Sequence, residues 1–271
     1  MDSNTYMGMK LSINKNFVDY ATKLYKSRDE EIFFFDFEDK RYWLKKARAT
    51  KSNLIHKLFY KLTSIDILLP VESKSDKESL NFETTKIERL KEKGISTPSI
   101  ILKNKEFFVL EDSGKMVNSY IRKKDITKEK MYYYIELMLK ELALIHNNKE
   151  YHGGAQARNF IYKEGKVTAI DFEDSFDKSI SLETLQFRDL ILFLLSLTKT
   201  RASFKLDYDF IINEYIKLVP QNKEFRKKLK TLADKISFLI NLSQNSVVNK
   251  IMGRDGKQFF KLFTILQNLK G

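Results

Sequence analysis

The sequence of 271 residues contains no cysteine, three histidines and three prolines. The lack of cysteine excludes a disulfide framework and a thiolate metal site, and the scarcity of histidine argues against a histidine-rich metal centre. The longest apolar run, residues 190–197, is far too short to cross a bilayer. The polar start of the chain has no apolar segment of the signal-peptide kind. Together with the missing cysteine, this predicts a cytoplasmic protein.

Lysine and arginine, in contrast, are abundant, and the formal net charge is +13. They are concentrated in two blocks. Residues 40–70 hold eight Lys or Arg against one Asp, and residues 215–271 hold twelve against three acidic residues. Two basic blocks favour contact with polyanions such as nucleotides, anionic lipids, phosphorylated sugars or nucleic acid. The alternative is that these lysines only form solvated faces.

The spacing of apolar residues predicts a mixture of helices and strands. Aromatic-rich segments on either side of a polar turn predict a β-hairpin over residues 31–46. Apolar residues at helical spacing predict a helix over 128–146 and a buried helix over 182–200. The other predicted elements are a helix over 80–93 that ends at Gly94, strands over 99–102 and 106–110, a hairpin over 159–170, and about three amphipathic helices within 206–271.

Residues 144–174 carry the clearest chemical signal. A helix ends near His146, a polar loop follows, and two short apolar strands are joined by a turn at 163–166. Asn159 enters the first strand and Asp171 leaves the second, so their side chains can converge at one end of the hairpin. Amide and carboxylate oxygens are hard ligands suited to Mg²⁺ on a phosphate.

This stretch resembles the catalytic region of the protein-kinase-like fold. Residues 152–159 read His-Gly-Gly-Ala-Gln-Ala-Arg-Asn, similar to the catalytic loop His-x-Asp-x-x-x-x-Asn. Residues 170–173 read Ile-Asp-Phe-Glu, similar to the metal-binding Asp-Phe-Gly that follows that loop. The resemblance is to the small atypical kinases, which include the lipopolysaccharide-core (Kdo and heptose) kinases of bacteria, the RIO kinases and the kinase of the KEOPS complex. It covers roughly residues 31–195.

The resemblance implies a two-lobed α+β fold of the protein-kinase type. Residues 1–112 would form an N-lobe with a small β-sheet and one helix, and residues 113–271 would form a helical C-lobe. The resemblance also implies ATP and Mg²⁺ as cofactors, with Asn159 and Asp171 as the metal ligands and as members of the catalytic site.

In the N-lobe, the resemblance implies that Lys45 holds the α- and β-phosphates and that Glu83 orients this lysine. Strand alternation places Lys46 on the opposite face, so only one of the two lysines can point into the cleft, and Lys45 is preferred. Glu88, on the same predicted helix, is the alternative acid. The backbone from Glu111 to Ser113 would pair with the edge of an adenine.

The chain departs from the kinase pattern at two places. Gly154 occupies the position of the catalytic Asp, and no Gly-rich loop precedes the first hairpin. Glycine has no side chain to accept a proton, so Gln156 and Asp174 are the predicted catalytic candidates, with Glu173 as a further carboxylate nearby. Alternatively, the acceptor needs little help from a base, because the transition state of phosphoryl transfer is loose.

Three other residues of this region have expected roles. Asp189, near the start of the buried helix, is expected to brace the catalytic loop, because an unpaired buried carboxylate is costly. His152 is expected to pack and to form hydrogen bonds rather than to act as an acid or base. Arg158 would either bind a substrate phosphate bidentately or form a salt bridge within the loop.

These observations predict an ATP-dependent kinase that transfers the γ-phosphate to a hydroxyl of a glycolipid or protein. The basic surface fits an anionic acceptor and a peripheral position on the cytoplasmic face of the inner membrane. Two other hypotheses stay open. Gly154 fits a pseudokinase-type regulatory module that binds nucleotide without transferring phosphate, and the basic blocks fit a nucleic-acid-associated protein.

Overall fold

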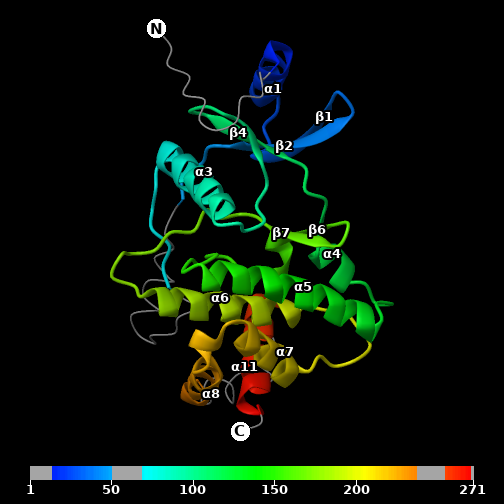
Figure 1. Cartoon of the computed structure of the whole chain (residues 1–271), viewed down its shortest axis with the longest axis vertical. Coiled ribbons are helices and arrows are strands. Elements are labelled where there is room, and N and C mark those ends of the chain that lie inside the picture. Colours follow the sequence, from blue (N-terminus) through cyan, green and yellow to red (C-terminus); the bar gives the residue numbers. More distant parts are fainter. Residues whose placement is uncertain (1–13, 51–68, 237–253, 270–271) are drawn as a thin grey trace.

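A computed structural model describes residues 14–50, 69–236 and 254–269. The N-lobe contains a four-stranded antiparallel sheet in the order β1-β2-β4-β3 (Figure 1). The predicted hairpin is confirmed as β1 and β2, whose tight turn places Glu38 and Asp39 at φ values of 47° and 60°. The strands are β1 (Ile32–Phe37), β2 (Lys40–Lys46), β3 (Ile100–Lys103) and β4 (Phe107–Glu111).

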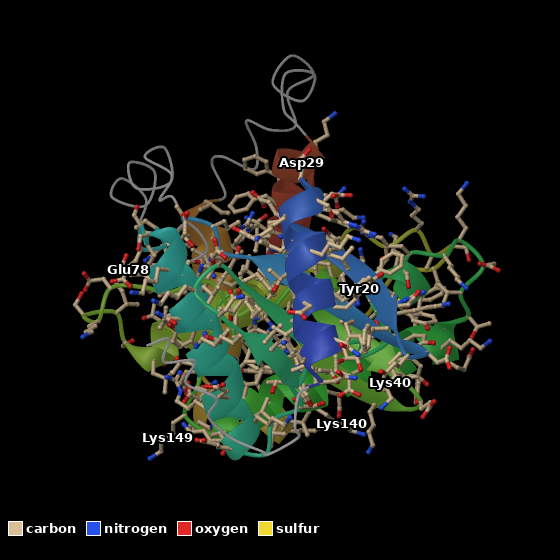
Figure 2. The ribbon with its side chains drawn as sticks, turned by 90° about the horizontal axis from the view of Figure 1, so that it is seen from above. Tyr20, Asp29, Lys40, Glu78, Lys140 and Lys149 are labelled. Carbon is tan, nitrogen blue, oxygen red and sulfur yellow. The ribbon has the colours of Figure 1, made fainter. Side chains whose placement is uncertain are left out.

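Helix α1 (Lys15–Ser27) covers one face of this sheet. Seen from above, α1 lies across the sheet (Figure 2). Phe17 and Ala21, one helical turn apart, pack with Phe33 and Leu44 in a separate small core. The opposite face of the sheet, which carries the alternate side chains, is therefore left to face the rest of the molecule.

Helix α3 (Asp76–Glu92) begins four residues before the predicted start. Ser75 and Glu78 form a capping box, in which the Ser75 amide donates to Oε2 of Glu78 at 2.8 Å. The predicted start of this helix at residue 80 was therefore four residues too late. The helix ends as expected before Gly94, which has a φ of 78°.

The C-lobe is built from helices beneath a second, three-stranded sheet in the order β5-β6-β7 (Figure 1). The predicted hairpin at 159–170 is confirmed as β6 (Phe160–Lys163) and β7 (Lys166–Ala169). The predicted helices at 128–146 and 182–200 are α5 (Lys128–Asn147) and α6 (Leu182–Leu197). The remaining elements are β5 (Lys115–Met116), α4 (Asn118–Ile121), the 3₁₀ turns η2 (Ala157–Asn159) and η3 (Pro220–Asn222), α7 (Tyr208–Leu218), α8 (Phe225–Lys235) and α11 (Arg254–Gln267).

One large core joins the two lobes. Leu80, Ile87 and Leu90 of α3 belong to the same buried cluster as the apolar faces of α5 and α6. Helix α3 therefore rests on the C-lobe and carries its polar residues to the boundary between the lobes. The two-lobed α+β fold with a sheet-containing N-lobe and a helical C-lobe is confirmed. Residues 237–253, part of the stretch predicted to form about three amphipathic helices, lie outside the described residues.

In the described part of the chain, no helix combines the length and the apolar character that a membrane span requires.

Candidate active site between the lobes

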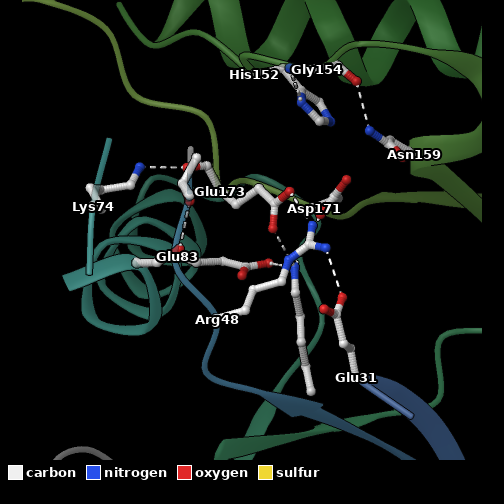
Figure 3. Close-up of polar contacts among 12 residues, drawn as sticks. Glu31, Arg48, Lys74, Glu83, His152, Gly154, Asn159, Asp171 and Glu173 are labelled. Atoms are coloured by element: carbon white, nitrogen blue, oxygen red, sulfur yellow. Dashed lines mark hydrogen bonds and ion pairs between the residues drawn. The ribbon is translucent and has the colours of Figure 1, made fainter. Parts of the chain in front are cut away.

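Lys45 enters the space between the lobes from β2. Strand alternation buries Leu44 against α1 and directs Lys45 to the opposite face. Nζ of Lys45 lies 2.8 Å from Oε1 of Glu83 and 3.1 Å from Oδ1 of Asp171 (Figure 3). Lys46, in contrast, donates to the carbonyl of Arg28 at the end of α1. The structure thus directs Lys45, and not Lys46, into the site.

Glu83 reaches Lys45 from the buried face of α3. Its side chain is 5% exposed, whereas Glu88 on the same helix is exposed to solvent. The expected partnership of Lys45 with Glu83 is confirmed by this contact, and the alternative with Glu88 is wrong. Since β2 and α3 are separate elements of the N-lobe, the ion pair fixes the position of the helix relative to the sheet.

Asp171 follows β7 and adopts a left-handed backbone conformation with a φ of 67°. Few residue types other than glycine adopt this conformation readily, and aspartate is among them. The preceding amide, of Ile170, donates to the carbonyl of Asn159 at 3.0 Å. This backbone bond holds the end of the β6–β7 hairpin together, so Asn159 and Asp171 lie at the same end of it.

The charges of Lys45 and Asp171 support one another. Burial by itself lowers the pKa of Lys45, but the carboxylates of Glu83, Asp171 and Glu173 outweigh burial and hold that pKa above its ordinary value. Burial by itself raises the pKa of Asp171, but Lys45 outweighs it and holds that pKa below its ordinary value. Lys45 therefore stays cationic and Asp171 anionic at neutral pH.

Asn159 is buried at the end of η2. Its Nδ2 donates to the carbonyl of Gly154 at 2.8 Å (Figure 3). The loop thus uses the nitrogen of this amide, while the amide oxygen has the chemistry of a ligand or acceptor. Gly154 thus serves the site through its carbonyl group, in the absence of a side chain.

Asp171 and Asn159 fit a Mg²⁺ ion, because both supply hard oxygen donors and Asp171 is ionised. Across the described ranges, no group of three His, Cys, Asp or Glu side chains could hold a metal ion by itself. The remaining ligands of a bound Mg²⁺ would have to be phosphate oxygens and water, as is usual for this ion.

Asp189 of α6 braces the loop that begins at Tyr151, as expected. Its carboxylate accepts the amide of His152 at 2.6 Å and that of Gly153 at 2.9 Å. His146, at the end of α5, lies 3.4 Å from the same carboxylate and bonds the hydroxyl of Tyr215 at 2.7 Å. All these groups are buried, so the backbone of the loop is fixed by a hydrogen-bonded network within the C-lobe.

His152 is a packing residue, as predicted. Its ring lies 4.8 Å from that of Phe172 and 5.6 Å from that of Phe160, measured between centroids. Burial lowers the pKa of His152 to about 4, so the imidazole is neutral at physiological pH. Nδ1 accepts the amide of Gly154 at 3.2 Å. The ring therefore positions the loop and is unsuited to proton transfer at neutral pH.

Two cations near Lys45 were not predicted. Arg48 donates to Oε1 of Glu173 and to Oε2 of Glu31, at 2.8 Å in each case (Figure 3). Lys74 donates to the carbonyl of Glu173 at 2.7 Å. Both residues lie in Lys-rich sequence, where no local pattern distinguishes them from solvated cations. They tie the segment after Asp171 to the N-lobe.

Lys86 is a further unpredicted residue, fully buried on the same face of α3 as Glu83. Its Nζ donates to the carbonyl of His152 at 3.0 Å and lies 3.9 Å from the centroid of the Tyr151 ring. Burial lowers the pKa of Lys86 to about 7. The signal available in the sequence was its position, three residues after Glu83 on one helical face.

The predicted hinge, from Glu111 to Ser113, connects β4 to the C-lobe. The amides of Glu111 and Asp112 donate to the carbonyls of Ser99 and Arg41 at 3.0 and 3.1 Å. An adenine would therefore have to use other backbone groups of this segment, such as those of Ser113. The assignment of Glu111 and Ser113 to cofactor binding stays a prediction.

The two catalytic candidates lie in different surroundings. Gln156 is half-buried within the loop, immediately before η2. Asp174 lies close to Gly153 and Gly154 of the loop. Arg158 is exposed, next to Asn159.

No protein-family model matches this sequence. An uncharacterized protein of Haemophilus influenzae (strain ATCC 51907 / DSM 11121 / KW20 / Rd) is 30% identical over 190 residues, which cover 70% of this chain and 72% of the relative. The chain belongs to the family of that protein. The Haemophilus relative has no described activity, so membership of its family places the chain among homologues without assigning a function.

Among solved structures, the ADP-bound crystal structure of aminoglycoside phosphotransferase APH(2'')-Ib is similar over 96% of this chain and 98% of that chain. The TM-score is 0.43 and the sequence identity is 12%. A likeness of this degree establishes no activity, so the function has to be inferred from the side chains of the site.

Proposed function

We propose that this chain is an ATP-dependent phosphotransferase of the kinase type, which transfers the γ-phosphoryl group of ATP to an acceptor hydroxyl. The observation that supports this best is the position of Lys45, between Glu83 and Asp171. Glu83 and Asp171 are 38 and 126 positions away from Lys45 in sequence. The three residues come from α3, from the segment after β7 and from β2. A buried, charged cluster of this kind is costly unless each charge is paired, and it is suited to binding phosphates.

In this proposal, each residue has a defined task. Lys45 binds phosphate oxygens of the nucleotide, and Glu83 keeps its ammonium group in place. Asp171 and Asn159 hold Mg²⁺, which when bound would offset negative charge on the phosphates. Asp189 and His152 keep the loop that carries Asn159 rigid. Phosphoryl transfer depends mainly on such positioning and on charge stabilisation.

The hinge side of the site is suited to a nucleoside. Trp43 lies on the same strand as Lys45, two residues earlier, so both side chains are directed to the same face of the sheet. Its Nε1 donates to Oδ1 of Asp112 at 2.8 Å, which fixes the indole ring beside the hinge. We expect the base to lie along this ring, with Ser113 supplying backbone contacts.

The acceptor in this proposal is an anionic molecule, either a glycolipid or a protein. Arg158 supports it, because an exposed guanidinium next to Asn159 can bind a phosphate group of the acceptor bidentately. The basic helix α8 lies at the end of the C-lobe remote from the N-lobe (Figure 1). It is too far from the site to bind the reacting group, and would instead hold the protein on an anionic surface such as the cytoplasmic face of a membrane.

The test is transfer of radiolabel from ATP labelled at the γ-phosphate, with Mg²⁺ present, to lipid and protein fractions of a bacterial extract. The proposal predicts labelling and ADP formation by the wild-type protein and by Lys46→Met, and loss of both in Asp171→Asn. ATP binding without ADP formation or labelling would instead favour the pseudokinase hypothesis. Salt-sensitive binding of RNA or DNA with no response to ATP would favour the nucleic-acid hypothesis.

A further inference from the structure

The loop position that lacks a side chain faces a carboxylate from another part of the chain. A Cβ atom on Gly154 would lie 4.0 Å from Oδ2 of Asp174. At the preceding residue, Gly153, a Cβ atom would lie only 3.0 Å from Cβ of Asp174, closer than such atoms normally approach. Gly153 also has a φ of 99°, which favours glycine. The two glycines thus leave the space in which Asp174 lies.

We propose that the carboxylate of Asp174 receives the proton of the acceptor hydroxyl, in the role for which Gly154 has no side chain. This rests on the phosphotransferase function proposed above. In the step, the acceptor oxygen forms a bond to the γ-phosphorus of ATP. The bond from that phosphorus to the β–γ bridging oxygen breaks, and ADP leaves with the electron pair. The acceptor proton passes to Asp174 and afterwards to solvent.

Asp174 is held in a fixed position. Lys74 anchors the two residues that flank Asp174 in the chain. It donates to the carbonyl of Glu173 at 2.7 Å and to Oγ of Ser175 at 2.8 Å. Nη2 of Arg188, from α6, lies 3.9 Å from Oδ2 of Asp174, and Nη1 of the same side chain donates to the carbonyl of Gly153. One buried guanidinium therefore links Asp174 to the glycine pair. Such support keeps a reacting group in its working geometry.

The surroundings of Asp174 favour proton uptake. Its side chain is 26% exposed, so an acceptor hydroxyl can reach it. Burial raises the pKa of Asp174; Arg188 opposes this, and the carboxylates of Glu173 and Asp171 add to it. A carboxylate with a raised pKa is a better proton acceptor at neutral pH than an ordinary one.

The other two candidates fit the role less well. Both carboxylate oxygens of Glu173 are paired with cations, Oε2 with Lys45 at 3.3 Å and Oε1 with Arg48 at 2.8 Å. Both oxygens are thus engaged by cations from the N-lobe and are not free to take a proton from an acceptor hydroxyl. Gln156 carries a neutral amide, which can orient a hydroxyl but cannot take its proton.

The first experiment compares Asp174→Asn with the wild-type protein, using water as the acceptor and Mg²⁺-ATP as the donor. The proposal predicts that ADP formation falls at least about 100-fold, the size expected for loss of a general base. ATP affinity, measured by calorimetry, should change less than about twofold, because Asp174 does not bind the nucleotide. If Asp174 only paired with Arg188, the melting temperature would fall and ADP formation per folded molecule would persist.

The second experiment replaces the carboxylate of Asp174 with one placed on the loop at position 154. The double variant Asp174→Ala with Gly154→Asp is compared with Asp174→Ala with Gly154→Ala. The φ of Gly154 is not in the left-handed region, so a side chain is compatible with its backbone, although Nδ2 of Asn159 would lie 3.3 Å from the new Cβ and must shift slightly. We expect ADP formation at least tenfold faster with Gly154→Asp, at similar ATP affinity and melting temperature.

The outcomes separate this proposal from the one on which it rests. Failure of the wild-type protein to bind Mg²⁺-ATP refutes the phosphotransferase function. ATP binding with ADP formation that survives in Asp174→Asn refutes the role of Asp174 alone. Bound ATP without any ADP formation by the wild-type protein also counts against that role. Loss in Asp174→Asn together with rescue by Gly154→Asp supports it.

Discussion

Nζ of Lys45 lies 2.8 Å from Oε1 of Glu83 and thereby joins β2 to α3. The same ammonium group contacts Asp171, which follows the C-lobe hairpin β6–β7. One cation thus links three elements that meet where the lobes adjoin. This relationship makes the boundary between the lobes a candidate nucleotide site.

Replacing Lys45 by methionine should weaken ATP binding at least tenfold, which corresponds to about 1.4 kcal/mol. The reason is that Lys45 is the cation placed between Glu83 and Asp171, and methionine keeps its length without its charge. The matched control is Lys46→Met, since Lys46 lies on the α1 side of β2, 5.1 Å from the ring of Tyr25. Calorimetric titration with Mg²⁺-ATP distinguishes the two. Equal affinities in the two variants would contradict the assignment of Lys45.

Asp189→Ala should destabilise the protein by at least about 3 kcal/mol. The substitution leaves the buried amides of His152 and Gly153 without an acceptor and removes a negative charge next to buried Arg188. Urea denaturation of the variant measures the loss. Asp125→Asn, at an exposed position, is the control and should change the unfolding free energy by less than about 0.5 kcal/mol. A small effect of Asp189→Ala would show that the loop does not depend on this carboxylate.

The lowered pKa of Lys86 predicts that the unfolding free energy depends on pH in a specific way. Its pKa is about 7 in the folded protein and near 10.5 when unfolded, so between these values the unfolded state binds more protons. The contribution of Lys86 to stability therefore increases as pH rises through this window. From pH 7 to 9, the unfolding free energy of the wild-type protein should gain about 2 kcal/mol relative to Lys86→Met.

Lys77→Met, which changes an exposed lysine on the same helix, is the control for Lys86→Met. The difference in unfolding free energy between Lys77→Met and the wild-type protein should stay constant from pH 7 to 9. Urea denaturation at each pH gives both differences. If the unfolding free energy of the wild-type protein instead fell relative to that of Lys86→Met as pH rises, this would contradict a depressed pKa of Lys86.

Two glycines with left-handed backbones offer a comparison. Alanine at Gly94 or at Gly153 is strained by φ values of 78° and 99°, at a cost of about 1 kcal/mol or more in each case. Only at Gly153 would the new methyl group also meet Asp174, at 3.0 Å. ADP formation per folded molecule should therefore fall in Gly153→Ala and stay unchanged in Gly94→Ala. Equal turnover in both would mean that the position of Asp174 is unimportant.

The polar positions of the candidate site could be predicted where local patterns constrain them. Alternation in β2 separated Lys45 from Lys46, and the hairpin at 159–170 brought Asn159 and Asp171 to one end. These patterns depend on short-range geometry, which is visible in sequence. The order of the elements then placed Glu83 on the helix whose buried face reaches Lys45.

Residues that act through long-range packing could not be predicted in this way. Lys86, Arg48 and Arg188 resemble any other cations in a chain with 49 Lys and Arg. The burial of Lys86 and Arg188 and the ion pairs of Arg48 depend on how segments far apart in the chain come together, which no local pattern records. Residues 1–28 left a short strand and a helix open from sequence, and the placement of α1 depends on the packing of Phe17 and Ala21 against the sheet.

The measurement that tests the central claim most directly is a thermal-shift titration with ATP, with and without Mg²⁺, on the wild-type protein and on Asp171→Asn. A ligand that binds only the folded state raises the melting temperature by mass action. We predict a rise with ATP that is larger with Mg²⁺ in the wild-type protein, and loss of the Mg²⁺-dependent part in Asp171→Asn. No shift of the wild-type protein at millimolar ATP would contradict the proposed nucleotide site.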